Sequence, residues 1–312
     1  MTRHLRSLLD LDADETSRLL DLAIAVKAEP GKYRTALDGK SIAMIFAKQS
    51  TRTRISFEVG IQQLGAQPLA LSSSGGTGMQ MGRGETVHDT AKVLSRFVDA
   101  IVIRTYGQDQ IEGLAEHGSI PVINALTDLY HPCQALADLQ TVREHLGATQ
   151  GKKLVYLGAG NNVAHSLMLA GPRAGMDVVV GCPDSLRPDP KVLERARADA
   201  SKYGTRVGVE TDVDAAVKGA DVVYTDTWVS MGEEDEAKRL IEILRPFSVT
   251  PELMGKTGKD KSIFMHCLPA HRGDEVVDEV MDGKWSVVFD QAENRLHAQK
   301  ALLLLLLGAE SF

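Results

Sequence analysis

Cysteine is scarce in this chain of 312 residues: only three are present, and they stand far apart. Cys133, Cys182 and Cys267 are too few and too scattered for a disulfide framework or a zinc site. The one long apolar run, residues 301–307, is far shorter than the roughly 20 residues of a membrane span. No apolar segment of the signal-peptide type follows the N-terminus. We therefore expect a protein of the reducing cytoplasm with no membrane partner.

An excess of positive charge is also lacking. Lysine and arginine total 35 against 42 acidic residues, which gives a formal net charge of -7. That balance argues against a nucleic-acid partner, although it leaves room for a local basic pocket. The apolar content of 43% is that of an ordinary globular protein, and the length suits two domains of roughly 150 residues each.

Short apolar segments alternate with segments whose apolar residues recur at helical spacing, a pattern typical of parallel sheets covered by helices. The expected strands are residues 42–46, 68–71, 99–104, 120–124, 153–158, 177–180, 207–210, 221–226, 262–268 and 286–290. We therefore expect an α/β fold with two domains, each a parallel β-sheet flanked by helices. They cover residues 1–146 and 147–290, and a final helix over 291–312 is expected to pack back on the first domain.

The stretch Ser50-Thr51-Arg52-Thr53-Arg54 stands between an expected strand and an expected helix. Backbone N–H groups at a helix start attract an anion, and hydroxyl and guanidinium groups supply further donors. A serine or threonine at this position is most often only a helix cap, but capping needs one hydroxyl and does not explain the two arginines. The stretch therefore predicts a phosphate site.

Two further donors follow expected strands. Arg104 ends one strand, and His131-Pro132-Cys133-Gln134 stands just beyond another. Ligands of parallel α/β sheets bind at the carboxyl ends of the strands, so we expect these residues to face the same region as Ser50–Arg54.

A dinucleotide site is the main alternative from another class of protein. Gly158-Ala159-Gly160-Asn161-Asn162-Val163 follows a strand and opens a helix, but Val163 stands where the fingerprint needs glycine or alanine. The two asparagines suit a small polar ligand better than a pyrophosphate.

Taken together, these stretches resemble the ornithine carbamoyltransferases within the aspartate/ornithine carbamoyltransferase family. The resemblance covers essentially the whole chain. Ser-Thr-Arg-Thr-Arg at 50–54 and His-Pro-Cys-Gln at 131–134 are motifs of the wider family. Asp-Thr-Trp-Val-Ser-Met-Gly at 226–232 and His-Cys-Leu-Pro at 266–269 resemble the segments that distinguish ornithine enzymes from aspartate enzymes.

The resemblance implies that carbamoyl phosphate and L-ornithine give L-citrulline and phosphate, in arginine biosynthesis or degradation, with no metal or cofactor. It also implies a homotrimer in which the loop bearing Gln80 reaches a neighbouring subunit's site. The carbamoyl phosphate ligands it implies are Ser50, Thr51, Arg52, Thr53, Gln80, Arg104, His131, Gln134, Cys267, Leu268 and Arg295. The ornithine ligands it implies are Asn162, Asp226, Ser230 and Met231.

Arg104, His131 and Cys267 are the residues to which the resemblance assigns catalysis. Arg104 and His131 would polarise the carbonyl oxygen. Cys267 could accept the proton of the attacking amine as a thiolate, or it could only orient the amine while the departing phosphate takes the proton. Aspartate, putrescine and N-acetylornithine are alternative amine substrates, and a non-catalytic trimeric binding protein is a rival from another class.

Overall fold

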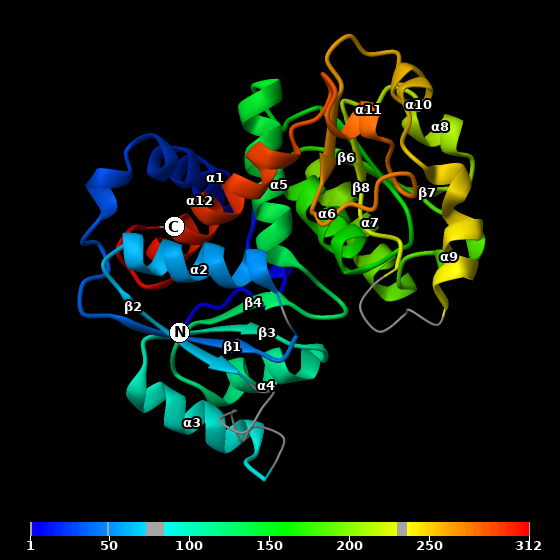
Figure 1. The fold of residues 1–312 in the computed structure, drawn as a ribbon. Helices are drawn as coiled ribbons and strands as arrows, with labels where there is room; N and C mark the ends of the chain where they lie inside the picture. The colour runs from blue at the N-terminus through cyan, green and yellow to red at the C-terminus, as the bar shows by residue number, and fades with distance from the viewer. Residues whose placement is uncertain (1, 49, 73–83, 230–235, 312) are drawn as a thin grey trace. The chain divides into compact units, whose positions relative to one another are not determined.

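The computed structural model describes residues 2–48, 50–72, 84–229 and 236–311, and it divides into two compact units (Figure 1). The first unit consists of residues 1–136 and 295–312, and the second of residues 137–294. The division falls within the helices α5 (Pro132–Leu146) and α12 (Val288–Leu306). The N-terminal unit therefore includes the C-terminal end of the chain.

The first unit contains a parallel sheet with the strand order β2-β1-β3-β4. The strands are β1 (Ser41–Phe46), β2 (Gln67–Ser72), β3 (Ala100–Arg104) and β4 (Val122–Leu126). All five residues of β3 are buried, as expected for a strand that is covered on both faces. The order reverses between β1 and β3, and the carboxyl ends at such a switch point are the usual place for a ligand.

Helices cover both faces of this sheet. In Figure 1, α3 (Val87–Phe97) and α4 (Gln108–His117) lie on one face. The opposite face carries α1 (Ala13–Ala28), α2 (Thr51–Gln63) and α12. The apolar run of the last helix is buried, because Leu302, Leu303 and Leu304 have no exposed surface.

The second unit contains a parallel sheet with the strand order β7-β6-β5-β8-β9. Its strands are β5 (Lys153–Leu157), β6 (Asp177–Gly181), β7 (Val207–Glu210), β8 (Val222–Thr225) and β9 (Ile263–His266). Its helices include α6 (Asn162–Arg173), α7 (Pro190–Tyr203), α8 (Val213–Val217), α9 (Ala237–Leu244), α10 (Pro251–Gly255) and α11 (Asp278–Met281). Here the order reverses between β5 and β8, so the segments that follow these two strands are the expected ligand region.

The predicted α/β class, with a parallel sheet flanked by helices in each half, is confirmed. The predicted strand over 286–290 is wrong, because α12 begins at Val288 and Ser286 forms only an isolated bridge with Phe264. A short apolar run does not by itself distinguish a strand from the first turn of a helix, and here the helix continues for 19 residues.

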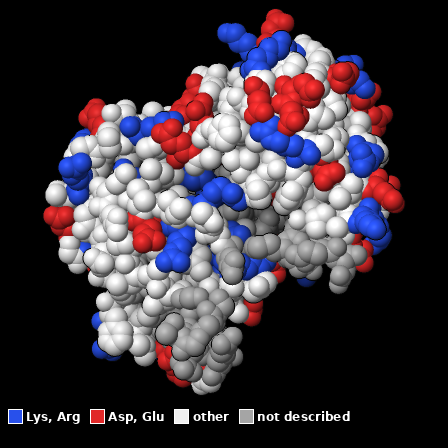
Figure 2. Space-filling model, viewed as in Figure 1, with Lys and Arg blue, Asp and Glu red and all other residues white. Residues whose placement is uncertain are grey.

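Charged side chains of both signs are interspersed on the face that Figure 2 shows. This mixture agrees with an overall charge of -7 that arises from many residues of each sign. Among the described helices, none combines the length and the apolar character that crossing a membrane requires.

Candidate active site

The predicted phosphate site lies at the N-terminus of α2. Ser50 is the N-cap, and its Oγ accepts a hydrogen bond from the N–H of Thr53 at 3.2 Å. Thr51 and Arg52 are exposed in the first turn, whereas Thr53 is buried. The helix start thus carries hydroxyl, guanidinium and backbone N–H groups, which are the groups that an anion site needs.

Arg104 and His131 occupy strand ends in the same unit. Arg104 is the last residue of β3 and pairs in register with Phe46, the last residue of β1. His131 follows β4 and immediately precedes α5. Both side chains are largely buried, with exposed fractions of 9% and 6%. Arg104 and His131 therefore both stand at the carboxyl edge of this sheet, where the segment after β1 also begins.

The imidazole of His131 is held neutral. Burial lowers its pKa well below the usual value, because the charged form is penalised away from water. The positive charges of nearby guanidinium groups lower the pKa further, in the order Arg295, Arg104 and Arg52. A neutral imidazole among these groups can donate one N–H hydrogen bond without adding to the positive charge.

Arg295, in α12, forms hydrogen bonds with a predicted ligand in each of two other helices, Gln134 in α5 and Thr53 in α2. Its Nη1 donates to Gln134 Oε1 at 2.6 Å, and its Nη2 donates to Thr53 Oγ1 at 3.3 Å. Arg295 is 5% exposed and Gln134 is 2% exposed. The structure therefore brings Thr53, Gln134 and Arg295 into one hydrogen-bonded group within the first unit.

Lys48 is a residue that the sequence did not single out. Its Nζ forms an ion pair with Asp128 and lies 4.4 Å from the centroid of the Tyr106 ring. Each of these residues lies two positions after the end of a strand: Lys48 after β1, Tyr106 after β3 and Asp128 after β4. Lys48 thus connects the three segments that follow β1, β3 and β4 at the carboxyl edge of the first sheet. Only the register of the strands reveals this arrangement.

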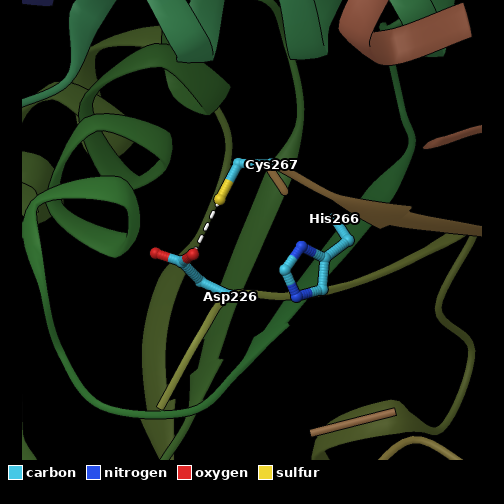
Figure 3. A group of neighbouring side chains, drawn as sticks. All are labelled: Asp226, His266 and Cys267. Carbon is cyan, nitrogen blue, oxygen red and sulfur yellow. Dashed lines mark hydrogen bonds between the residues drawn. The ribbon is translucent and has the colours of Figure 1, made fainter. Parts of the chain in front are cut away.

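In the second unit, Asp226 and Cys267 lie together at the ends of β8 and β9 (Figure 3). Cys267 Sγ donates a hydrogen bond to Asp226 Oδ1 at 2.7 Å. The other carboxylate oxygen, Oδ2, accepts from Asn161 Nδ2 at 2.9 Å. Asp226 is 8% exposed, so these two donors fix a largely buried carboxylate.

Asn161 is a second residue that sequence reasoning missed, since the expectation was placed on Asn162. The Asn161 side chain caps α6, and its Oδ1 accepts from the N–H groups of Val163 and Ala164. Asn162 is the first residue of the helix and is partly buried. The N-cap preference for asparagine could have identified Asn161 as the residue fixed in place.

Cys267 is a thiol in this setting. Burial raises its pKa well above the usual value, and the charge of Asp226 and the hydrogen bond to it raise the pKa further. Asp138 also raises the pKa, whereas a side-chain hydrogen bond with Tyr224 lowers it. A protonated sulfur agrees with its role as the donor to Asp226.

The loop that carries Cys267 is held by its neighbours. Leu268 has a φ of 57°, which is uncommon for a residue other than glycine. Its N–H donates to His266 Nδ1 at 2.8 Å, and His266 Nε2 lies 3.3 Å from the buried Glu275 Oε1. His266 thus fixes the backbone on either side of Cys267.

Asp226, His266 and Cys267 have potential metal-ligand atoms within 4.8 Å of one another. However, Nδ1 of His266 accepts from a backbone N–H and Nε2 faces Glu275. Both ring nitrogens of His266 therefore already have partners, and the group does not fit a three-ligand metal site without breaking one of these contacts.

The glycine turn after β5 is packed against other backbone. The N–H of Gly160 donates to Leu186 O at 2.8 Å, and a Cβ at Gly160 would lie 2.2 Å from the nitrogen of Pro188. The space that a dinucleotide would need next to Gly160 is therefore occupied by the chain itself, which argues against the alternative of a dinucleotide site. The predicted ligands Gln80, Ser230 and Met231 lie outside the described residues.

Two family models match the chain. The carbamoyl-phosphate-binding domain of aspartate/ornithine carbamoyltransferase matches residues 3–144, and the aspartate/ornithine-binding domain of that family matches residues 150–306. The chain belongs to the aspartate/ornithine carbamoyltransferase family. As a carbamoyltransferase it is a transferase, and the resemblance seen in its motifs is confirmed.

Relatives of this carbamoyltransferase are similar over almost their whole length. An ornithine carbamoyltransferase of Methanothermobacter thermautotrophicus is 55% identical over 307 residues, covering 98% of this chain and 99% of the relative. One of Pyrococcus furiosus, named anabolic, is 51% identical over 312 residues, covering 99% and 98%. A solved structure of ornithine carbamoyltransferase from Pyrococcus furiosus has a TM-score of 0.94 and 50% identity, covering 99% of this chain and 98% of that one.

Proposed function

We propose that this carbamoyltransferase transfers the carbamoyl group of carbamoyl phosphate to the δ-amine of L-ornithine. The products are L-citrulline and phosphate. The observation that carries the choice of ornithine is the Asp226 carboxylate, whose two oxygens are held by Asn161 and Cys267. A buried, oriented carboxylate suits an ammonium group of the substrate and would repel the second carboxylate of aspartate.

The first unit is proposed to bind carbamoyl phosphate. The N-terminus of α2, with Ser50, Thr51, Arg52 and Thr53, suits the phosphate. Arg104, His131, Gln134 and Arg295 are assigned to the carbamoyl end and its bridging oxygen. This assignment is supported by the hydrogen bonds of Arg295 to Gln134 and Thr53, and by the match of the family's carbamoyl-phosphate-binding domain to residues 3–144.

The chemistry needs an oxyanion site and no covalent enzyme intermediate. The δ-amine attacks the carbonyl carbon, and negative charge builds on the carbonyl oxygen as the new C–N bond forms. Arg104 and the neutral His131 donate hydrogen bonds to that oxygen, and the bond from carbon to the phosphate oxygen then breaks. Arg52 and the start of α2 stabilise the charge on the departing phosphate.

The second unit is proposed to bind ornithine through Asp226, with Asn162, Ser230 and Met231 as further ligands. Cys267 and Leu268 are assigned to the reacting groups. Because the pKa of Cys267 is raised, we favour the alternative in which the thiol orients the amine and the departing phosphate accepts the proton. The deprotonated amine is the form that attacks.

The assembly and setting follow from the same proposal. We propose a homotrimer in which the segment bearing Gln80 completes a neighbouring subunit's site. A reducing cytoplasm is supported by the three free cysteines, of which Cys133 and Cys182 are buried. A role in arginine biosynthesis is supported by the relative named anabolic.

An assay for citrulline and other ureido products tests which amine accepts the carbamoyl group. The purified chain is given carbamoyl phosphate with ornithine, putrescine, aspartate or N-acetylornithine in separate reactions. We expect rapid product formation with ornithine alone. Product with another amine and none with ornithine would overturn the assignment, and phosphate release without any carbamoylated amine would contradict the transferase proposal.

A further inference from the structure

A row of side chains on one face of the second sheet leads to Cys267. The register of β5, β8 and β9 aligns Tyr156, Tyr224 and Met265 side by side. Successive side chains of a strand alternate between faces, so Asp226 and Cys267, two positions further along, lie on the same face. Tyr224 therefore stands one step behind the thiol and carboxylate pair.

Tyr224 is fully buried, and its hydroxyl has a defined neighbour. The hydroxyl oxygen accepts a hydrogen bond from Gln291 Nε2 at 3.1 Å. The ring lies against Tyr156, with 5.8 Å between the ring centroids. Because the oxygen receives the Gln291 hydrogen, the hydrogen of the tyrosine hydroxyl is directed to another acceptor.

Gln291 is held by three contacts, all within the second unit. Its Oε1 accepts from the backbone N–H of His266 at 2.8 Å, which fixes which end of the amide is the oxygen. Its Nε2 donates to Asp138 Oδ1 at 2.7 Å as well as to Tyr224. Gln291 and Asp138 have no exposed surface. The amide therefore has one orientation, and it links α5, α12, β8 and β9.

We propose that Tyr224 is a positioning residue for Cys267, and that Asp138 and Gln291 hold its hydroxyl in place to donate to the sulfur. This inference rests on the proposed role of Cys267 beside the reacting amine. None of these three residues is among the substrate ligands assigned above. In this proposal they affect the reaction only indirectly, by orienting the lone pairs and the hydrogen of Cys267 Sγ.

The network has an electrostatic consequence. A hydrogen bond from the Tyr224 hydroxyl, placed as proposed, lowers the pKa of Cys267 against the larger raising effects of burial, Asp226 and Asp138. Tyr224 itself keeps its proton, because burial raises its pKa well above the usual value. The other titratable groups close to the sulfur are His266, in the cluster of Figure 3, and Tyr156, whose pKa responds to Cys267. Removing the tyrosine hydroxyl alone should therefore make the thiol harder to ionise.

The test measures alkylation of Cys267 by iodoacetamide in the full chain without substrates, with the labelled peptide identified by mass spectrometry. Tyr224→Phe should slow labelling of Cys267 about tenfold at each pH from about 7 to 9, because a hydrogen bond to a charged group is lost. Cys133 and Cys182 are internal controls. Burial raises the pKa of Cys133 to about 12 and that of Cys182 to about 11, and Tyr224 is not among the groups that shift either pKa, so their labelling should be unchanged.

Tyr156→Phe is the matched control. It removes a buried hydroxyl from the same row of the sheet, but that hydroxyl hydrogen-bonds to Asn161. Labelling of Cys267 should stay within about twofold of the unmodified chain. In turnover assays Tyr224→Phe should lower kcat about tenfold, while the KM for carbamoyl phosphate stays within about twofold.

Gln291→Met is the second variant. It tests whether the hydroxyl of Tyr224 positions Cys267 if the Tyr224→Phe chain does not fold. It keeps the volume of the side chain but removes both polar ends, so labelling should again slow, by about threefold or more. Unchanged labelling of Cys267 in a folded Tyr224→Phe or Gln291→Met chain would overturn the inference. The labelling readout does not depend on turnover, so a failure of the proposed function would appear separately, as an absence of citrulline from the unmodified enzyme.

Discussion

At the scale of single residues, the candidate site depends on a few buried polar groups whose partners are fixed. Asp226 receives a hydrogen bond on each carboxylate oxygen, and Arg295 donates to both Gln134 and Thr53. Such groups are costly to bury without partners, so these hydrogen bonds hold the side chains in defined positions. The roles of the individual residues can be separated by paired substitutions.

Arg52 and Arg54 form the first such pair, because they share one helix. Arg54 lies 3.5 Å from Glu58 in an exposed ion pair that contributes little to stability. Arg52→Ala should lower kcat/KM for carbamoyl phosphate about 100-fold, since a charged contact to the leaving phosphate is lost. Arg54→Ala should change it by no more than about twofold. Equal effects of the two substitutions in a steady-state assay would remove Arg52 from the phosphate site.

Asn161 both caps α6 and donates a hydrogen bond to Asp226, and substitution by serine or alanine separates these two functions. Asn161→Ser keeps an oxygen that can cap α6 but loses the donor to Asp226, so the KM for ornithine should rise about tenfold with little loss of stability. Asn161→Ala should show the same rise in KM and also lose about 1 kcal/mol of unfolding free energy. Urea unfolding and ornithine saturation curves measure the two effects. A normal KM in Asn161→Ser would exclude a role for the amide in holding Asp226.

At the scale of elements, the turn between β5 and α6 is set by backbone packing. A Cβ at Gly160 would lie 2.2 Å from Pro188 N and 2.6 Å from Arg187 C, neither of which is a flexible side chain. Gly160→Ala should therefore lower the unfolding free energy of the second unit by about 3 kcal/mol. Gly208→Ala is the control, because nothing lies within 4 Å of the added Cβ in β7. Urea denaturation monitored by circular dichroism compares them, and equal stabilities would contradict the packing argument.

The sequence predicts most of these elements because their apolar periods are regular and their caps are clear. The strand expected over 286–290 is wrong, because Val288 is already the first residue of α12. Val287, just before the helix, donates its N–H to Phe264 O of β9. The positions of Ser50 and Arg104 at the sheet edge could be predicted, because Ser50 follows one apolar segment and Arg104 ends another. Tyr224 and Gln291 could not, because their contact joins residues 67 positions apart and depends on packing between elements.

At the scale of the whole molecule, the proposed reaction assigns carbamoyl phosphate to residues of the first unit and ornithine to residues of the second. Its pH dependence should be that of the amine. Burial and three guanidinium groups lower the pKa of His131, so the imidazole stays neutral well below its usual range. The group that limits the rate from about pH 6 to 8 is then the ornithine δ-ammonium, which must lose its proton before it can attack.

We therefore expect kcat/KM for ornithine to rise about tenfold per pH unit from about pH 6 to 8, with no second break near pH 6.5. Initial rates at saturating carbamoyl phosphate in buffers of constant ionic strength give this profile. A slope of about two below pH 6.5 would mean that His131 takes up a proton there, contrary to the direction of its pKa shift.

In the proposed reaction, the carbamoyl carbon is transferred directly to the δ-nitrogen of ornithine. The most direct measurement mixes carbamoyl phosphate carrying ¹³C with ornithine carrying ¹⁵N at the δ-position and follows the reaction by ¹³C NMR. We predict a citrulline signal split by a one-bond coupling between ¹³C and ¹⁵N, growing at the same rate as phosphate is released. Phosphate release accompanied only by ¹³C-bicarbonate or cyanate, with no coupled signal, would contradict direct transfer to ornithine.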